Sequence, residues 1–159
     1  MKKTKQIVLI LNNTRSIHNV GSIFRIADTA GVSKIYLTGY TPTPQDRFGR
    51  IQKEIKKTAL GAEEIVPWEH VSRIGDVLKK LKKEHFYIVG VEQSKKSVDY
   101  KTVQQKQKTV FVFGNEVNGL SDAVLKHCDT IVEIPMRGKK ESLNISVAAG
   151  IVLFRILNI

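Results

Sequence analysis

Three short stretches of the sequence combine glycine with polar side chains that could bind a ligand or take part in a reaction. The first, residues 19–25, reads Asn-Val-Gly-Ser-Ile-Phe-Arg. Asn19 can cap a helix, Gly21 allows another backbone to approach closely, and Arg25 is a permanent cation suited to phosphate. Taken alone, this stretch favours a structural alternative, a capped helix with a surface pair of Arg25 and Asp28.

The second stretch, residues 114–121, reads Gly-Asn-Glu-Val-Asn-Gly-Leu-Ser and follows an apolar run that ends at Phe113. Its spacing comes close to that of a phosphate-binding P-loop. Leu120 stands in place of the phosphate-binding lysine, however, and Glu116 would repel a nucleoside triphosphate. A neutral or cationic ligand suits this loop better. The structural alternative is a glycine turn before a short helix capped by Ser121.

The third stretch is the C-terminal segment, residues 134–159. An apolar run leads to a basic glycine turn, then to Ser142, Leu143 and Asn144, and then to a segment that is apolar almost all round. A helix without a polar face must be buried against its own chain or a partner subunit. Because the free N–H groups and the positive dipole end lie at its polar first turn, we expect this turn to form the floor of a binding site. The alternative is a capped core helix behind a solvated basic turn.

The elements that position these stretches alternate along the chain between strand and helix. Apolar, β-branched runs predict strands, whereas the spacing i, i+3, i+4, i+7 predicts helices. The predicted strands cover residues 6–11, 34–38, 64–68, 86–91, 109–113 and 130–134, and the predicted helices cover residues 19–30, 51–58, 71–81 and the segment after Asn144. The fold class is therefore α/β, a single doubly wound domain with a mostly parallel sheet, helices on both faces and ligands beyond the carboxyl ends of the strands.

Composition narrows the class of partner. The 159 residues suit one domain, 1–159, and their net charge of +11 favours nucleic acid over a merely soluble basic surface. The single Cys128 fits packed core better than a nucleophile, and the four histidines show no ligand spacing, so no metal is expected. No apolar run reaches the length of a membrane span. We expect a cytoplasmic protein without a membrane partner.

Together, the three stretches resemble the ordered motifs of TrmH-type RNA ribose 2′-O-methyltransferases, members of the SPOUT superfamily. The shared segments are Asn-x-Gly-x-x-x-Arg, Phe-Gly-Asn-Glu-x-x-Gly-Leu-Ser and Ile-Pro-Met-x-Gly-x-x-x-Ser-Leu-Asn-x-Ser-x-Ala-Ala, and the match runs from Asn13 to the C-terminus. The resemblance implies S-adenosylmethionine as cofactor, S-adenosylhomocysteine as product, a C-terminal deep trefoil knot, and a homodimer with its active sites at the subunit interface.

Carried over position by position, the resemblance assigns residues to two roles, and basic charge indicates a third, contact with phosphate. The catalytic residues are Asn19, Arg25, Glu116, Ser142 and Asn144. The cofactor-binding residues are Phe113, Gly114, Asn115, Glu116, Gly119, Ile134, Met136, Ser142, Leu143 and Asn144. Phosphate contacts are expected from Arg25, Arg47, Arg50, Arg137, Lys139 and Lys140, of which Arg47 and Arg50 lie in an irregular loop at residues 40–50.

The resulting hypothesis is S-adenosylmethionine-dependent methylation of a ribose 2′-hydroxyl in structured RNA. Transfer RNA is favoured over ribosomal RNA because the chain lacks an additional N-terminal RNA-binding domain. Arg25 is assigned to positioning an RNA phosphate and stabilising the developing alkoxide, since a guanidinium is a poor proton acceptor. The alternatives are a non-catalytic RNA-binding protein that keeps the same scaffold, and an ordinary nucleotide-binding enzyme, which the missing P-loop lysine disfavours.

Overall fold

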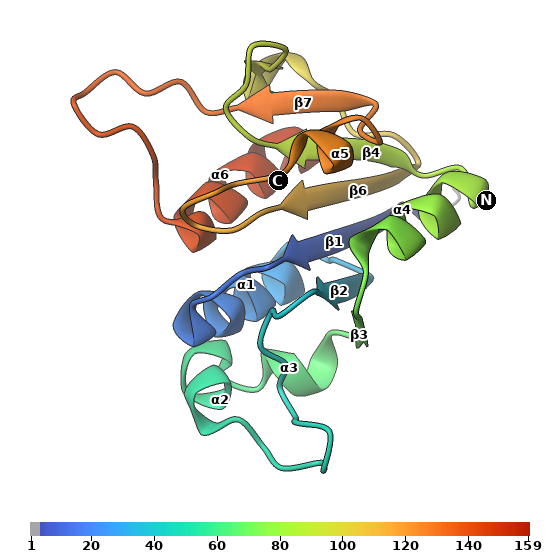
Figure 1. The fold of residues 1–159 in the computed structure, drawn as a ribbon, viewed down its shortest axis with the longest axis vertical. Helices are drawn as coiled ribbons and strands as arrows, with labels where there is room; N and C mark the ends of the chain where they lie inside the picture. The colour runs from blue at the N-terminus through green and yellow to red at the C-terminus, as the bar shows by residue number, and fades with distance from the viewer. Residues whose placement is uncertain (1–3) are drawn as a thin grey trace.

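Seven parallel strands form the central layer of the computed structural model, which describes residues 4–159 (Figure 1). Their order across the sheet is β3-β2-β1-β6-β4-β7-β5, and every pairing between neighbours is parallel. The strands are β1 (Gln6–Asn12), β2 (Lys34–Thr38), β3 (Trp68–Val71), β4 (Tyr87–Val91), β5 (Val98–Asp99), β6 (Lys108–Phe113) and β7 (Thr130–Glu133).

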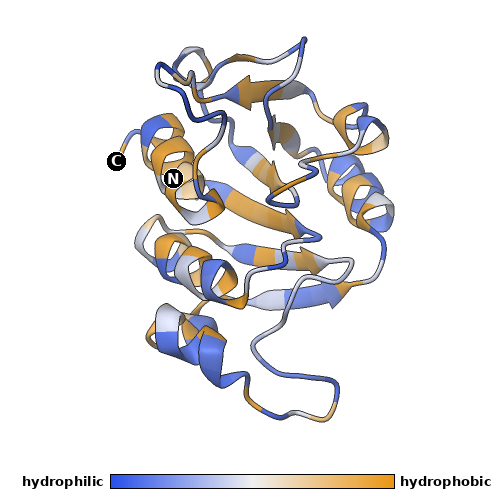
Figure 2. Ribbon diagram, turned by 60° about the vertical axis from the view of Figure 1, so that its left-hand side comes forward, coloured by the Kyte–Doolittle hydropathy of each residue, from blue (hydrophilic) through white to orange (hydrophobic). Residues whose placement is uncertain are grey.

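Helices cover both faces of this sheet because its central strands are apolar on both sides. Along β1, Ile7, Leu9 and Leu11 belong to one hydrophobic core, and Val8 and Ile10 belong to the other. In Figure 2 the central strands are accordingly mostly hydrophobic. The first core is closed by α1 (Ile17–Thr29), α2 (Lys53–Ala59), α3 (Ala62–Ile65) and α6 (Ile145–Leu157), and the second by α4 (Ile74–Lys83) and α5 (Asp122–Leu125); a short 3-10 turn, η1, spans Tyr100–Thr102.

The predicted doubly wound α/β class is therefore confirmed, and most predicted strands are correct to within one residue at each end. The predicted strand at residues 64–68 is wrong. Residues 62–65 form α3 instead, and the strand begins only at Trp68. Pro67 explains why the strand does not begin earlier, because proline has no N–H to donate to a neighbouring strand.

Two other predicted bounds require correction. Val71 ends β3 and does not begin the following helix, which starts at Ile74. Helix α1 begins at Ile17, and its capping residue is Ser16, whose side chain accepts a hydrogen bond from the Asn19 N–H at 3.2 Å. Asn19 therefore lies inside the helix and does not cap it.

The short strand β5 was not predicted, because two residues are too few to show a periodicity.

Helix α6 is buried on most of its circumference, as its composition requires. Six of its residues are at most 9% exposed, and its interior position beside α1 joins it to the larger core. Among its large apolar residues, Val147 and Phe154 are exceptions, at 49% and 38% exposed. Since they are seven residues apart, they lie on one stripe of the helix. Within its own chain, this helix leaves one apolar stripe uncovered.

Cys128 behaves as a core residue and not as a nucleophile. Burial raises the pKa of its thiol to about 11, and its sulfur lies 3.6 Å from the carbonyl oxygen of Val124. A thiol with that pKa holds almost no thiolate at neutral pH. The prediction of packed core is confirmed.

Helices α1 and α2 meet at Gly21, and this contact requires glycine. A β-carbon at residue 21 would lie 1.9 Å from Thr58 Oγ1 and 2.6 Å from the Ile55 carbonyl oxygen. Thr58 also donates its hydroxyl to the His18 carbonyl oxygen at 3.2 Å. The expected close backbone approach at Gly21 is therefore made by α2.

We predict that Gly21→Ala lowers the free energy of unfolding by about 1–3 kcal/mol, because the added methyl group overpacks the α1–α2 contact. Gly75→Ala is the matched control, since Gly75 is also helical but a β-carbon at residue 75 would meet no neighbour within 4 Å. Alanine there should raise the free energy of unfolding by up to about 1 kcal/mol. Urea unfolding of both variants at equal protein concentration measures the two effects, and equal effects would contradict the packing argument.

Candidate active site

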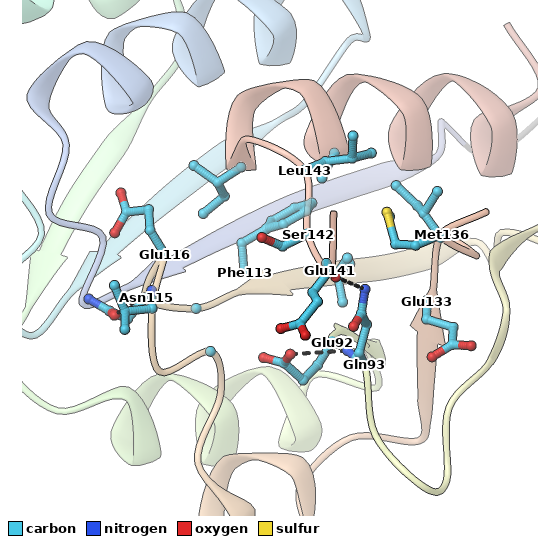
Figure 3. Close-up of a pocket in the computed structure, with 17 residues that line it drawn as sticks. Glu92, Gln93, Phe113, Asn115, Glu116, Glu133, Met136, Glu141, Ser142 and Leu143 are labelled. Atoms are coloured by element: carbon cyan, nitrogen blue, oxygen red, sulfur yellow. Dashed lines mark hydrogen bonds between the residues drawn. The ribbon is translucent and has the colours of Figure 1, made fainter. Parts of the chain in front are cut away.

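A cavity of about 320 Å³ opens beyond the carboxyl ends of β4, β6 and β7 (Figure 3). Its walls come from the segments that leave these three strands and from the start of α6. The lining residues are Val91, Glu92, Gln93, Phe113, Gly114, Asn115, Glu116, Val117, Gly119, Glu133, Ile134, Met136, Glu141, Ser142, Leu143, Ile145 and Ala148. This is the edge of the sheet at which a doubly wound domain is expected to bind ligands.

Nine of the ten residues assigned to a cofactor pocket from sequence line this cavity. The tenth, Asn144, caps α6 by accepting from the Ser146 N–H at 2.9 Å, and its amide donates to Asn19 Oδ1 at 3.1 Å. Two residues 125 positions apart in the chain, both assigned to catalysis, are thus in direct contact beside the cavity.

Sequence reasoning missed the wall contributed by β4. Glu92 and Gln93 follow this strand directly, and the Gln93 side chain donates to the Glu141 carbonyl oxygen at 2.7 Å across the cavity mouth. No motif marks them. The only signal in the sequence was their position after an apolar strand, and using it would have required knowing that β4 lies between β6 and β7.

The glycine loop at residues 114–119 closes on itself. Asn115 and Gly119 exchange backbone hydrogen bonds of 3.2 and 2.9 Å, and a β-carbon at Gly114 would lie 2.4 Å from the Gly119 carbonyl carbon. Glu92 supports the loop from below by accepting from the Leu120 N–H at 2.7 Å. Leu120 is buried, so the residue at the P-loop lysine position cannot contact a ligand.

The Asn115 side chain joins this loop to two other strand ends. Its oxygen accepts from the N–H groups of Val117 and Asn118, both at 2.9 Å. Its amide nitrogen donates to the Asn13 carbonyl oxygen at 2.9 Å and to the Tyr40 hydroxyl at 3.0 Å. All of the hydrogen-bonding groups of this buried amide are therefore in use.

Glu116 binds the start of helix α1. Its two carboxylate oxygens accept from the N–H groups of Arg15 and Ser16 at 3.0 and 3.1 Å. Partial burial acts to raise the pKa of this carboxyl, but the backbone N–H groups and the Asn19 side chain outweigh it and hold the pKa below its usual value. Glu116 is therefore ionised at neutral pH, at the edge of the cavity.

The cavity is acidic although the chain is strongly basic. Its lining contains four glutamates, at positions 92, 116, 133 and 141, and no lysine, arginine or histidine from residues 4–159. Apolar side chains from Phe113, Ile134, Leu143 and Ile145 provide the rest of the surface. Such a lining favours a ligand with a flat apolar part and a positive charge.

The predicted cationic residues lie outside the cavity. Arg25 is exposed on α1 and does not line it, and no ion pair between Arg25 and Asp28 is present in the described part of the chain. Arg137, Lys139 and Lys140 are exposed on the turn between β7 and α6. Arg47 and Arg50 lie in the loop between β2 and α2, at the opposite end of the molecule in Figures 1 and 2. One protomer therefore does not gather its predicted RNA contacts in one place.

Metal ligands and membrane-spanning helices are both missing from residues 4–159. No group of three or more His, Cys, Asp or Glu side chains in this range is arranged to hold a metal ion. No helix there is both long and apolar enough to span a membrane.

The fold and the cavity define a class: a parallel α/β domain whose ligand cleft is formed by the ends of β4, β6 and β7 and by the start of the C-terminal helix. Residues 6–154 match the model of the SpoU rRNA Methylase family. The chain belongs to this family. It is 33% identical over 151 residues to the 23S rRNA (guanosine-2′-O-)-methyltransferase RlmB of Pseudomonas aeruginosa and 36% identical over 149 residues to RlmB of Escherichia coli strain K12. These alignments cover 95% and 92% of this chain but 58% of each relative, so the chain spans little more than half of their length.

Solved structures of the same family have the same fold. The TrmH/SpoU tRNA modifying enzyme of A. aeolicus superposes with a TM-score of 0.84 at 30% identity, over 99% of this chain and 76% of that enzyme. An AdoMet-bound rRNA methyltransferase from Sinorhizobium meliloti gives a TM-score of 0.86 at 26% identity, over 99% of this chain and 58% of that protein. The resemblance recognised in the sequence is confirmed, and so is the α/β architecture; the trefoil knot stays a prediction.

We predict that Asn115→Ala lowers the free energy of unfolding by about 1–3 kcal/mol, because it leaves buried hydrogen-bonding groups without partners. Tyr40→Phe removes a single one of these bonds and should cost about 0.5–1.5 kcal/mol. Denaturant unfolding measures both values. A larger loss for Tyr40→Phe would show that the amide is not the main link between the three strand ends.

We predict a pH-dependent effect for Glu116→Gln. The folded pKa of Glu116 is below its usual value of 4.5, so the carboxylate contributes stability above that value and loses it as pH falls through the lower folded pKa. The variant should therefore be less stable than the parent at pH 7, and the difference should shrink as the pH is lowered below about 4.5. Melting temperatures across this range test the prediction, and a difference that grows with acidity would contradict it.

Proposed function

We propose that this chain is an S-adenosylmethionine-dependent methyltransferase that modifies a ribose 2′-hydroxyl in RNA. The observation that carries the proposal is the acidic cavity between the ends of β4, β6 and β7 in a chain of net charge +11. A cationic cofactor fits the cavity, and a polyanionic substrate fits the surface. Support comes from the family, whose relatives are named as RNA 2′-O-methyltransferases and include an AdoMet-bound protein.

The cavity suits the adenine ring and the positive groups of S-adenosylmethionine. Phe113, Ile134 and Leu143 offer apolar contacts for the adenine ring, and the loop around Gly119 offers backbone groups. The sulfonium and the amino group of this cofactor are positive, so glutamates at the wall favour its binding. When bound, the cofactor supplies an activated methyl group whose leaving group is a neutral thioether, which requires no metal.

The protein's part in the reaction is to hold and orient the ribose. In the transfer, the 2′-oxygen forms a bond to the methyl carbon as the carbon–sulfur bond breaks, and the hydroxyl proton passes to water or to a phosphate oxygen. We assign Arg25 to the RNA phosphate and to the negative charge that develops on the ribose oxygen. Asn19, Ser142 and Asn144 provide neutral hydrogen-bonding groups beside the cavity, and Glu116 fixes the start of the helix that carries Arg25.

We further propose a homodimer in which Arg25 serves the cavity of the partner subunit. Two observations support it: Arg25 does not line the cavity of its own chain, and α6 leaves Val147 and Phe154 exposed on one stripe. Because α6 packs beside α1, burying this stripe against a second copy would bring the two α1 helices near the interface. Phe154→Asp should then shift the protein toward monomers.

RNA is the proposed substrate class, and the named relatives divide between its members. RlmB acts on 23S rRNA, while the A. aeolicus enzyme is described as a tRNA modifying enzyme. The weak preference for transfer RNA stays a prediction, as do cytoplasmic location and single-domain organisation. The methylation assay must therefore offer both RNA classes.

We predict that the protein transfers a labelled methyl group from S-adenosylmethionine to RNA, with the label mapping to a ribose. Total RNA from cells that lack the gene provides unmodified substrate of both classes. Isothermal calorimetry should detect binding of S-adenosylmethionine, but no binding of ATP or NAD. Labelling of a base would overturn the proposed reaction, and RNA binding without cofactor binding would favour a non-catalytic protein.

In the same assay, Arg25→Ala should slow single-turnover methylation roughly 10²- to 10³-fold, because it removes a preorganised charge from the transition state. Cofactor affinity should be unchanged, and Arg25→Lys should recover only part of the rate, since lysine lacks the bidentate geometry. Full activity of Arg25→Ala at saturating RNA and cofactor would remove Arg25 from the catalytic residues.

A further inference from the structure

The loop between β2 and α2 exposes an aromatic ring that the fold does not use. Phe48 is 67% exposed, against 38% for Phe154 and below 10% for Phe24, Phe86, Phe111 and Phe113. In Figure 1 its loop extends away from the sheet, below α2. Tyr40, at the start of the same loop, contributes to the fold because its hydroxyl accepts a hydrogen bond from the Asn115 amide. Phe48 has no comparable contact with the core.

Two arginines lie over the Phe48 ring. The guanidinium carbon of Arg47 is 4.8 Å from the ring centroid, and that of Arg50 is 5.2 Å from it. Both distances are within the range of a cation–π interaction. The cluster of Arg47, Phe48 and Arg50 thus presents one aromatic and two cationic planes to solvent.

Asp46 holds this cluster in a fixed turn. Its Oδ1 accepts from the N–H groups of Phe48 and Arg50 at 2.8 and 3.0 Å, and its Oδ2 accepts from Arg50 Nε at 2.6 Å. The Arg50 N–H is the main reason that the pKa of Asp46 lies below its usual value, so the carboxylate stays ionised at neutral pH. The turn orients Phe48 outward before any ligand arrives.

The two arginines differ in freedom. Arg50 is held by Asp46, whereas Arg47 has no carboxylate partner among residues 4–159. Arg47 can therefore leave the ring at the cost of one exposed cation–π contact, while Arg50 remains in place. When Arg47 leaves, more of the Phe48 ring becomes open to a flat ligand.

The surroundings of the cluster fit a polyanion. Lys53, Lys56 and Lys57 are exposed on α2, the helix that follows the loop. The one acidic residue of this helix, Glu54, lies 3.5 Å from the His18 ring. Helix α2 packs through Thr58 on α1, which carries Arg25. Exposed cations are therefore present on the loop of Phe48, on α2 and, at Arg25, on the helix against which α2 packs.

We propose that Phe48 is a stacking platform for an unpaired base of the RNA substrate, and that Arg47 moves from the ring to an adjacent phosphate when the base binds. This inference rests on the proposed function and specifies its substrate: RNA with a flipped-out or loop nucleotide in addition to the nucleotide that is methylated. Unstacked bases are recognised in this way by aromatic and arginine side chains, whereas paired bases keep their faces covered. An exposed phenylalanine in contact with two arginines has no such use on a duplex.

The test uses the full chain and two RNA probes of equal length, a hairpin with 2-aminopurine in its unpaired loop and a fully paired duplex with the same label. Phe48→Ala should weaken hairpin binding roughly 5- to 100-fold, the range that loss of one stacked base implies, and should abolish quenching of the 2-aminopurine fluorescence. Duplex binding should change little. Phe48→Trp should restore both signals, and Phe48→Leu should restore neither, because it keeps apolar surface without an aromatic face.

Ile65→Ala is the control, since Ile65 is 66% exposed but has no aromatic ring or stacked arginine. It should leave binding and quenching unchanged. Equal hairpin affinity and equal quenching for Phe48→Ala and the parent protein would overturn the proposal. If Phe48→Ala instead changes sedimentation while RNA binding is intact, the loop is a protein interface and the proposal is also wrong.

Methylation of total RNA by the parent protein is measured in parallel, so that the two proposals fail separately. If RNA is methylated but the Phe48 variants bind and quench like the parent, the enzyme assignment stands and the stacking platform is wrong. If quenching depends on Phe48 but neither methylation nor cofactor binding is detected, the stacking platform stands and the enzyme assignment is wrong. Unfolding free energies of all variants, expected to match the parent because Phe48 is exposed, exclude misfolding as the cause.

Discussion

The hydrogen bonds of the Asn115 amide hold together the ends of three strands, and the rest of the site depends on them. This side chain joins the loop after β6 to the Asn13 turn after β1 and to Tyr40 after β2. Parallel strands end at the same edge of a sheet but have no bonds of their own beyond it. The amide supplies these bonds, so the glycine loop has one fixed shape. The hydrogen bond from the Leu120 N–H to Glu92 and the close contact between Gly114 and Gly119 also fix the shape of this loop.

The charges of the molecule are separated in a way that matches a reaction between unlike ligands. Carboxylates surround the cavity, while arginines and lysines stand on the turn after β7, on the β2–α2 loop and on α1 and α2. A positive cofactor is favoured inside the cavity and an anionic polymer outside it. Glu116 connects the two regions because it borders the cavity and binds the N–H groups at the start of α1. The helix that carries Arg25 is thereby anchored to the wall of the cavity.

The bounds of some helices and strands can be predicted from the sequence, and the bounds of others cannot, for identifiable physical reasons. Buried parallel strands such as β2 and β6 are continuous apolar runs, so their bounds were predicted to within one residue. The start of α1 was misplaced because both Ser16 and Asn19 are residue types that cap helices well. In the structure the Ser16 side chain caps the helix, and Glu116, distant in the chain, binds the N–H groups of residues 15 and 16. The strand expected at residues 64–68 failed because a helical turn before Pro67 has no distinct periodicity in so few residues.

The sequence by itself determined the family, the α/β class and nine of the seventeen residues that line the cavity, because these depend on motifs and periodicities that are local in the chain. It did not determine the wall formed by Glu92, Gln93 and Glu133, or the contact between Asn19 and Asn144. Those depend on the strand order β6-β4-β7 and on α6 lying beside α1, which are properties of the assembled sheet. Local spacing fixes which face a side chain takes within its element, whereas packing between distant elements decides which side chains meet.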